Sequence, residues 1–296
     1  MTEGKESMRV EEEASVENGA FAVCTTCPHG CRLAPGKTGY CRARVNVDGT
    51  IVPHSYGRVT SLALDPIEKK SIARWRPGTT VLSVGGYGCT MGCPFCQNDS
   101  IAQAGEDDVE WIPVEPEALV RRALELRDRG CIGIAYTYNE PLAAWEFVRD
   151  CARLTHEAGL ANVLVSNGMV NAGPLAEVAP LMDAANIDLK CFTEQGYRRL
   201  GGDLSAVKRT IETLVGEGTC HVEVTTLVVP GLSDDPEQID GLCAWLAGVD
   251  AGIPYHLTRF FPHYRMADVP PTPLSTMHEL ARVARRHLGD VLLGNM

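Results

Sequence analysis

From Val81 to the C-terminus, stretches with a β-strand pattern alternate with stretches that have an α-helical pattern. This alternation predicts a parallel sheet, because each helix returns the chain so that the next strand runs in the same direction. Alternation alone does not distinguish an open doubly wound sheet from a barrel. We expect strands at 81–88, 132–138, 162–166, 186–191, 221–229, 255–261 and 291–293, and helices at 116–128, 141–158, 174–181, 205–215 and 275–287, with a further helix from about 236.

Three consecutive strands of this pattern are polar on one face and apolar on the other. A parallel strand that is buried on both faces is apolar throughout. The polar faces therefore point into a polar space, most simply the solvated interior of a barrel that takes a ligand. Scattered buried polar residues are the alternative. The polar positions, which alternate along each strand, are Asn186, Asp188 and Lys190; His221, Glu223 and Thr225; and His256 and Thr258.

Three cysteines follow the first predicted strand, with the spacing Cys-x3-Cys-x2-Cys. Cys89, Cys93 and Cys96 can converge on one metal centre. A structural zinc site and a ferredoxin-type cubane both need four ligands, so a cluster on these three cysteines would leave one iron open to a further ligand. The alternative is a zinc site whose fourth ligand lies elsewhere in the sequence.

A second group of four cysteines lies near the N-terminus, in a segment that is rich in glycine and proline. Cys24, Cys27, Cys31 and Cys41 have the spacing Cys-x2-Cys-x3-Cys-x9-Cys. The segment has little core of its own, so metal binding has to supply the free energy that orders it. Zinc and an iron–sulfur cluster both satisfy four thiolates. The spacing leaves open a structural staple and an auxiliary electron-transfer centre.

Composition excludes several classes of protein. A net charge of −11 argues against nonspecific binding of nucleic acid, which depends on a basic surface. The chain has no apolar run of about 18 residues, which a membrane-spanning helix needs, and its first residues lack the apolar region of a secretory signal. We expect a cytoplasmic protein whose 12 cysteines are thiols or metal ligands. The expected organisation is a disordered acidic tail at 1–20, a Cys-rich segment at 21–80 and the α/β unit at 81–296.

The run from Cys89 to Cys96, with Phe95 before its last cysteine, resembles the signature of the radical S-adenosylmethionine (SAM) superfamily. Beyond residue 20, nearly the whole chain resembles the AmmeMemoRadiSam-system radical SAM proteins, which are similar to pyruvate formate-lyase activating enzymes. The motifs that carry this closer resemblance are Cys-Pro-His-Gly-Cys at 27–31, Asp-Pro-Ile-Glu-Lys-Lys at 65–70, Tyr-Thr-Tyr-Asn-Glu-Pro at 136–141 and His-Leu-Thr-Arg-Phe at 256–260.

The resemblance implies an incomplete barrel of six βα units, with a 4Fe-4S cluster on the three cysteines after the first strand. The open iron would bind the amino and carboxylate groups of SAM. Further residues at the carboxyl ends of the strands, where such barrels have their active sites, would contact SAM. The contacts implied in this way are Phe95, Glu140, Asn167, Asp188 and Lys190. The resemblance also places residues 228–231 near the adenine.

One motif departs from the family. Glu140 and Pro141 match the end of the family's Gly-Gly-Glu-Pro motif, which contacts the SAM amino group, but Tyr138 and Asn139 stand in place of the two glycines. The Glu140 carboxylate can still pair with an ammonium group. We therefore expect the side chain at 140 to make this contact.

The function implied by the resemblance is reductive cleavage of SAM to a 5′-deoxyadenosyl radical, which abstracts hydrogen from a protein or small-molecule substrate. The compact chain favours an activase-like role, with a low-potential electron donor of flavodoxin or ferredoxin type. No residue is assigned as a catalytic acid or base. The alternative functions are an iron–sulfur electron carrier and a metal-stapled interaction module without SAM chemistry. Candidate substrate contacts are His221, Glu223, His256 and Arg259.

Overall fold

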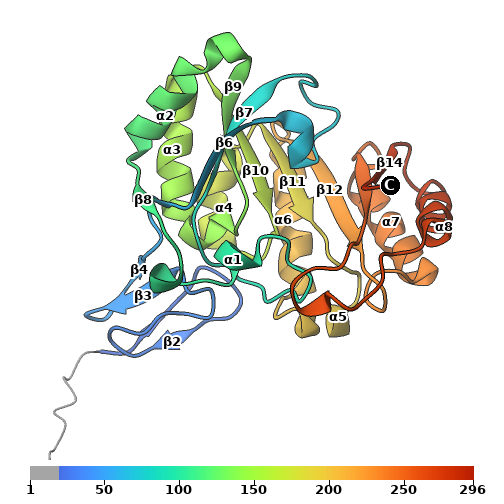
Figure 1. Cartoon of the computed structure of the whole chain (residues 1–296), viewed down its shortest axis with the longest axis horizontal. Coiled ribbons are helices and arrows are strands. Elements are labelled where there is room, and N and C mark those ends of the chain that lie inside the picture. Colours follow the sequence, from blue (N-terminus) through green and yellow to red (C-terminus); the bar gives the residue numbers. More distant parts are fainter. Residues whose placement is uncertain (1–19) are drawn as a thin grey trace, which may run out of the picture.

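The computed structural model describes residues 20–296 (Figure 1). Its central element is an eight-stranded sheet in the order β14-β13-β12-β11-β10-β9-β7-β6. Seven neighbouring strands run parallel, and β6 (Ser61–Pro66) pairs antiparallel with β7 at one edge. β6 and β14 do not pair with each other, so the sheet is open. The parallel strands are β7 (Thr80–Gly85), β9 (Cys131–Tyr136), β10 (Ala161–Ser166), β11 (Ala184–Asp188), β12 (His221–Val228), β13 (Tyr255–Arg259) and β14 (Val291–Gly294).

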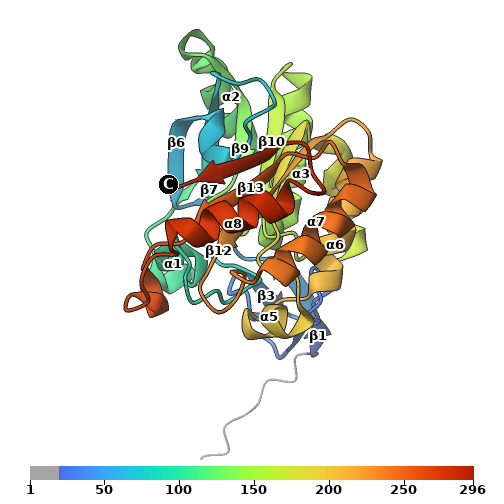
Figure 2. The same cartoon turned by 90° about the vertical axis from the view of Figure 1, so that its right-hand side faces the viewer.

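Helices connect the parallel strands and cover one face of the sheet, as Figures 1 and 2 show. Within residues 20–296, no helix has the length and hydropathy that crossing a bilayer requires. The predicted alternation of strands and helices is confirmed. The longer helices are α2 (Pro116–Glu125), α3 (Trp145–Glu157), α4 (Ala172–Val178), α6 (Leu204–Gly216), α7 (Pro236–Asp250) and α8 (Leu274–Ala284).

Local differences from the predicted helices have identifiable causes. The helix expected at 141–158 is divided into a 3-10 turn, η4 (Pro141–Ala144), and α3, because Ala144 leaves the helical conformation with φ −122° and ψ 52°. Helix α5 (Glu194–Arg199) was not expected, since six residues are too short to show a helical hydrophobic period. Short helix α1 (Asp99–Ala102) follows the cysteine loop.

The N-terminal part of the chain forms small antiparallel pairs below the carboxyl ends of the sheet strands (Figure 1). The expected tail at 1–20 lies almost entirely outside the described residues. The boundary expected between 80 and 81 differs from the structure, because β6 belongs to the main sheet, and Ile67 and Ile72 pack in its core against Val81. The small strands are β1 (Ala22–Val23) with β2 (Arg32–Leu33), β3 (Arg44–Val47) with β4 (Thr50–Pro53), and β5 (Arg58–Val59) with β8 (Ile112–Pro113).

Hydrogen bonds attach the Cys-rich segment to the rest of the molecule, and two of them involve the cysteine loop and α3. The Cys89 amide donates a hydrogen bond to the Cys41 carbonyl at 3.2 Å. The buried Arg44 guanidinium donates to both carboxylate oxygens of Glu146 on α3, at 2.7 and 2.8 Å. Gly88 makes the first contact possible, because it has φ +86° and a Cβ atom there would lie 2.3 Å from the Cys41 carbonyl oxygen. The first contact joins the two cysteine groups directly.

We predict that Gly88→Ala loosens the Cys-rich segment, because the new Cβ atom has to displace the Cys41 backbone. Gly78→Ala is the matched control: Gly78 also has a left-handed φ of +78°, but a Cβ atom there would meet no atom within 4 Å beyond its chain neighbours. The control substitution should cost only the conformational strain of about 1–2 kcal/mol. Limited proteolysis and melting temperature should show faster cleavage in residues 20–60 for Gly88→Ala alone. Equal effects of the two substitutions would contradict the tight contact.

Candidate functional site

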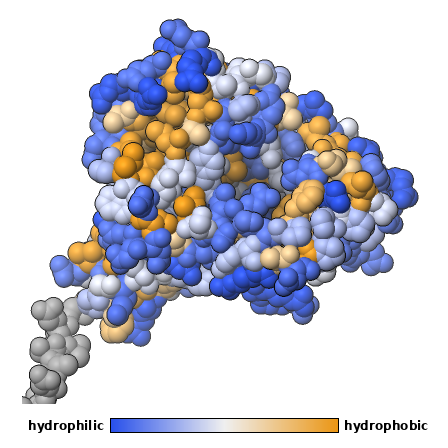
Figure 3. All heavy atoms as spheres, viewed as in Figure 1, coloured by the Kyte–Doolittle hydropathy of each residue, from blue (hydrophilic) through white to orange (hydrophobic). Residues whose placement is uncertain are grey.

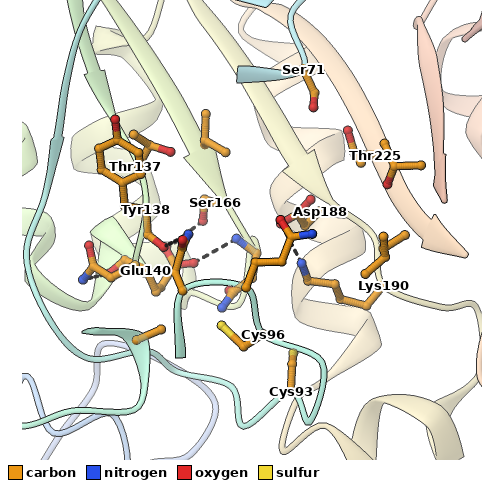
Figure 4. Close-up of a pocket in the computed structure, with 18 of the residues that line it drawn as sticks. Ser71, Cys93, Cys96, Thr137, Tyr138, Glu140, Ser166, Asp188, Lys190 and Thr225 are labelled. Atoms are coloured by element: carbon orange, nitrogen blue, oxygen red, sulfur yellow. Dashed lines mark hydrogen bonds and ion pairs between the residues drawn. The ribbon is translucent and has the colours of Figure 1, made fainter. Parts of the chain in front are cut away.

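A cavity of about 550 Å³ opens at the carboxyl ends of the parallel strands. Figure 3 shows this face hollowed near its middle, and Figure 4 shows the side chains that converge there. Loops that follow different strands, far apart in the sequence, supply the wall. The three cysteines and the five SAM contacts predicted from the resemblance all line it: Cys89, Cys93, Cys96, Phe95, Glu140, Asn167, Asp188 and Lys190.

The cysteine loop after β7 brings three thiols to the cavity. Cys93 is buried, and Cys89 and Cys96 are half-buried. Within residues 20–296, no three His, Cys, Asp or Glu side chains form a group that could hold a single metal ion. A cubane is different, since each of its cysteines binds a separate iron and the thiolates are spread around the cluster.

Burial disfavours the thiolate form of these cysteines. Burial raises the pKa of Cys93 to about 12, although the nearby Lys190 ammonium acts to lower it. Burial also raises the pKa of Cys89 well above its usual value, and the Glu140 carboxylate adds to this effect. The ligand form of cysteine is the thiolate, so metal binding has to displace these protons and supply the compensating charge.

Glu140 lies between the end of β9 and η4, and its side chain is completely enclosed. One carboxylate oxygen, Oε1, accepts hydrogen bonds from the Ser166 hydroxyl at 2.8 Å and the Leu142 amide at 3.0 Å. The other, Oε2, accepts from the Asn167 amide at 2.8 Å. Burial nevertheless raises the pKa of Glu140 to about 7. The carboxylate caps η4, and Glu140 also lines the cavity.

Asn167 and the Asp188–Lys190 pair connect other strand ends to the cysteine loop. The Asn167 side-chain amide lies 3.5 Å from Cys89 Sγ and donates to the Thr90 hydroxyl at 3.1 Å. After β11, Lys190 Nζ bonds Asp188 Oδ2 at 2.6 Å (Figure 4). Burial acts to lower the pKa of Lys190, but the Asp188 carboxylate raises it overall. The pair therefore keeps an ammonium group beside the cysteines.

Part of the cavity wall was not predicted. The 3-10 helix η1 (Ile67–Lys70) and the residue after it contribute Glu68, Lys69 and Ser71. The motif at 65–70 was noticed in the sequence, but it was assigned to the separate Cys-rich segment. Its hydrogen bonds explain its place: Asp65 bonds Lys70 and the Tyr138 hydroxyl, which brings η1 to the end of β9.

The candidate substrate contacts separate into three groups. His256 lines the cavity, and its Nε2 lies 2.5 Å from Glu223 Oε2. Glu223 is fully buried and also bonds His221, so neither of these two residues lines the cavity. Arg259 was wrongly placed: its Nε donates to the Thr272 carbonyl at 2.7 Å, away from the cavity wall. Residues 228–231, expected near an adenine, do not line the cavity either.

The N-terminal cysteines lie near one another but outside the cavity wall. Burial raises the pKa of Cys27 to about 12, and the neighbouring Cys41, Cys24 and Cys31 add to this effect. Among residues 20–296, these thiols do not form a group of three or more side chains that could hold a single metal ion.

Known proteins share both the sequence pattern and the fold. The Radical SAM superfamily pattern matches residues 83–243. An uncharacterized protein of Methanocaldococcus jannaschii is 35% identical over 276 residues, which cover 92% of this chain and 81% of that protein. The indoleacetate decarboxylase activating enzyme of Tractidigestivibacter scatoligenes is 26% identical, over 65% of this chain and 63% of its own length. The pyruvate formate-lyase 1-activating enzyme of Escherichia coli is 28% identical, over 51% of this chain and 62% of its own length.

The chain thus spans less than two thirds of the length of either activating enzyme. Among solved structures, a radical SAM methyltransferase from Sphaerobacter thermophilus has a TM-score of 0.55 at 16% identity, over 74% of this chain and 67% of that one. QueE from Escherichia coli has a TM-score of 0.51 at 13% identity, over 81% of this chain and 94% of that one. These structures share the α/β fold. The match of the family pattern to more than half of the sequence establishes that the chain belongs to the radical SAM superfamily.

Proposed function

We propose that this protein is an enzyme that binds a 4Fe-4S cluster through Cys89, Cys93 and Cys96 and cleaves SAM reductively. The observation that carries the proposal is the convergence of these cysteines with Glu140 and Lys190 on one cavity. Such a cluster would pass one electron from an external reductant to SAM, giving methionine and a 5′-deoxyadenosyl radical that takes hydrogen from a substrate. The open sheet then corresponds to the family's incomplete barrel of six βα units.

The remaining side chains would bind and orient SAM. Glu140 Oε1 already accepts two hydrogen bonds, whereas Oε2 accepts one and has a further lone pair for an ammonium donor. The Lys190 ammonium would attract the SAM carboxylate, and Asn167 is placed to bond the same end of the molecule. Phe95, which is buried in the cavity wall, offers an aromatic surface to the adenine.

An activase-like role fits the size of the cavity and the names of two relatives. The indoleacetate decarboxylase activating enzyme and the pyruvate formate-lyase 1-activating enzyme are named for the enzymes that they activate. A cavity of about 550 Å³ is in the range, roughly 300–1,000 Å³, that holds one small ligand. With SAM in place, only a small group, such as one residue of a protein loop or a small molecule, would reach the radical. His256 is the candidate substrate contact in the wall.

An external reductant is also part of the proposal. We expect a low-potential donor of flavodoxin or ferredoxin type and a cytoplasmic site of action. The deciding experiment is anaerobic reconstitution with iron and sulfide, followed by SAM and reductant, alone and then with candidate partner proteins. Formation of 5′-deoxyadenosine tests SAM cleavage, and the position of hydrogen loss tests the substrate class.

Replacing Cys89, Cys93 and Cys96 together with alanine should abolish 5′-deoxyadenosine formation and remove about four iron atoms per chain. The control is Cys243→Ser, because Cys243 is buried in α7, away from the cavity. Iron analysis and visible absorbance of the anaerobic proteins measure the cluster. Full SAM cleavage by the triple variant would refute the assignment, as would an unchanged iron content.

Glu140→Gln should weaken SAM binding by roughly ten- to a hundredfold, because it removes a charge-assisted contact. The glutamine also has an NH2 group in place of one carboxylate oxygen. This donor would face either the Asn167 amide, which now bonds Oε2, or the two donors that now bond Oε1. Ser166→Ala is the control, since it keeps the Glu140 carboxylate and removes only the hydroxyl's hydrogen bonds to Glu140 and from the Gly168 amide. Calorimetry on the reconstituted, unreduced protein measures the affinity. An unchanged affinity would favour a purely helix-capping role.

The same contact gives a pH dependence. In the ligand-free protein the pKa of Glu140 is raised to about 7, so below this pH the carboxyl group is mostly protonated. Pairing with an ammonium requires the ionised form, and SAM binding must then release a proton. Affinity should fall by about tenfold per pH unit from pH 7 toward pH 5, and Glu140→Gln should remove this slope.

We further propose that Cys24, Cys27, Cys31 and Cys41 bind a second metal centre that holds residues 20–60 in place. The segment packs on the cysteine loop through the Cys41 carbonyl, so its order and that of the loop are linked. Zinc and an iron–sulfur cluster would each satisfy the four thiolates. Its main role would be structural, since closed four-sulfur sites are commonly so.

Cys27→Ala should remove the second metal centre, which is either about four iron atoms or one zinc ion per chain. It should also make residues 20–60 sensitive to protease, because metal binding orders the segment. SAM cleavage should be affected less than by loss of Cys89, Cys93 and Cys96. Metal analysis and limited proteolysis check both effects. A variant that keeps its full metal content and resists protease would refute the second centre.

A further inference from the structure

Tyr138 has a backbone conformation that a tyrosine rarely adopts. It lies between the end of β9 and Glu140, and its φ of +71° is in the left-handed region. Glycine enters this region without penalty, whereas for other L-residues the penalty corresponds to about five- to thirtyfold in population. The resembling family motif has a glycine at this place. Here the tyrosine must be kept in the conformation by its surroundings.

The surroundings of the Tyr138 side chain supply such a restraint. Its hydroxyl donates to Asp65 Oδ2 at 2.5 Å, and Lys70 Nζ bonds the same oxygen at 2.8 Å. Lys70 Nζ also lies 4.6 Å from the centre of the Tyr138 ring. Burial acts to raise the pKa of Asp65, but the Lys70 ammonium and the Tyr138 hydroxyl hold it well below its usual range. Asp65 and Lys70 are both buried, so the anchor is itself rigid.

The conformation at Tyr138 determines the positions of its neighbours in the cavity wall. The Tyr138 carbonyl accepts a hydrogen bond from Asn98 Nδ2 at 2.7 Å, two residues after Cys96. The next residue, Asn139, accepts from the Gly86 amide at 3.0 Å, and Glu140 follows. Figure 4 shows Tyr138 and Glu140 side by side on the same wall. A change of φ at 138 would turn the carbonyl away from Asn98 and move Glu140.

We propose that Asp65 and Lys70 form a clamp that keeps Tyr138 in the left-handed conformation and thereby fixes Glu140 and Asn98 for SAM binding. The identity of the ligand as SAM rests on the proposed function, whereas the effect of the clamp on the conformation of Tyr138 does not. Asp65, Lys70 and Tyr138 are positioning residues. The clamp replaces the conformational freedom that a glycine would provide at position 138.

A series of substitutions at Tyr138 separates this role from the alternatives. Tyr138→Phe and Tyr138→Ala keep the strain but lose the anchor, so SAM affinity should fall by about five- to thirtyfold. Tyr138→Gly loses the anchor together with the strain, so its affinity should stay within about threefold of the wild type. Calorimetry on anaerobically reconstituted, unreduced full-length protein measures the dissociation constants, with iron content as a control.

If the Tyr138 ring contacted SAM directly, Tyr138→Phe would retain affinity and Tyr138→Gly would lose the most. That order would overturn the clamp, and so would equal affinities across the series. As a second test, Asp65→Asn should weaken SAM binding in the wild-type background but have little effect in the Tyr138→Gly background. A loss of the same size in both backgrounds would show that Asp65 acts only on general stability.

Melting temperatures of the ligand-free proteins test the clamp without SAM. Tyr138→Phe should melt below the wild type, and Tyr138→Gly should melt above Tyr138→Phe, although glycine removes more side-chain contacts. If the variants melt in this order but the wild-type protein binds no SAM, the proposed function is refuted and the clamp is supported. A protein that binds SAM but lacks the order would refute the clamp alone.

Discussion

The buried carboxylate of Glu140 joins the elements on which the site depends. It follows β9, caps η4 and accepts hydrogen bonds from Ser166 and Asn167 at the end of β10. Asn167 in turn contacts Cys89 in the loop after β7. A buried ionisable group is costly unless it is paired or hydrogen-bonded, so these contacts fix three strand ends relative to one another. Three hydrogen bonds do not fully compensate for burial, as the pKa of about 7 shows. A cationic ligand beside Glu140 would offset the remaining cost of burying its carboxylate.

The Cys-rich segment depends on the sheet in a different way. Its strands are two to four residues long, so much of its order has to come from contacts with other elements and from the metal centre that we propose. The Arg44–Glu146 pair and the close approach of Gly88 to Cys41 attach it to α3 and to the cysteine loop. One attachment point is the amide of Cys89, the first ligand of the proposed cluster. Disorder in the segment would therefore displace Cys89.

Much of the fold and of the cavity could be predicted from sequence, because both follow from short-range patterns. Strand–helix alternation located the parallel strands, and parallel strands bring their carboxyl ends to one edge, so residues as distant as Cys89 and Lys190 were expected together. Long-range pairing was not predictable. β6 joins β7 through an antiparallel connection that interrupts the alternation, and the placement of Arg259 depends on its bond to the Thr272 carbonyl. The left-handed conformation of Tyr138 contradicts its residue type and is visible only with Asp65 and Lys70 in place.

Different parts of the cavity wall carry different chemical groups. The strand-end wall has the cysteines, Glu140 and Lys190, whereas β12 and β13 contribute Thr225 and His256. Although burial acts to raise it, hydrogen bonds, including those from His256 and the Ala73 amide, hold the pKa of Glu223 at about 2. Since the Glu223 carboxylate can only accept, His256 Nε2 must donate to it, and Nδ1 is the nitrogen left for the cavity. In its neutral form, Nδ1 would accept a hydrogen bond from a substrate N–H or O–H group. Under the proposed function, β12 and β13 would therefore contact the substrate, and the wall with the cysteines, Glu140 and Lys190 would bind the cluster and SAM.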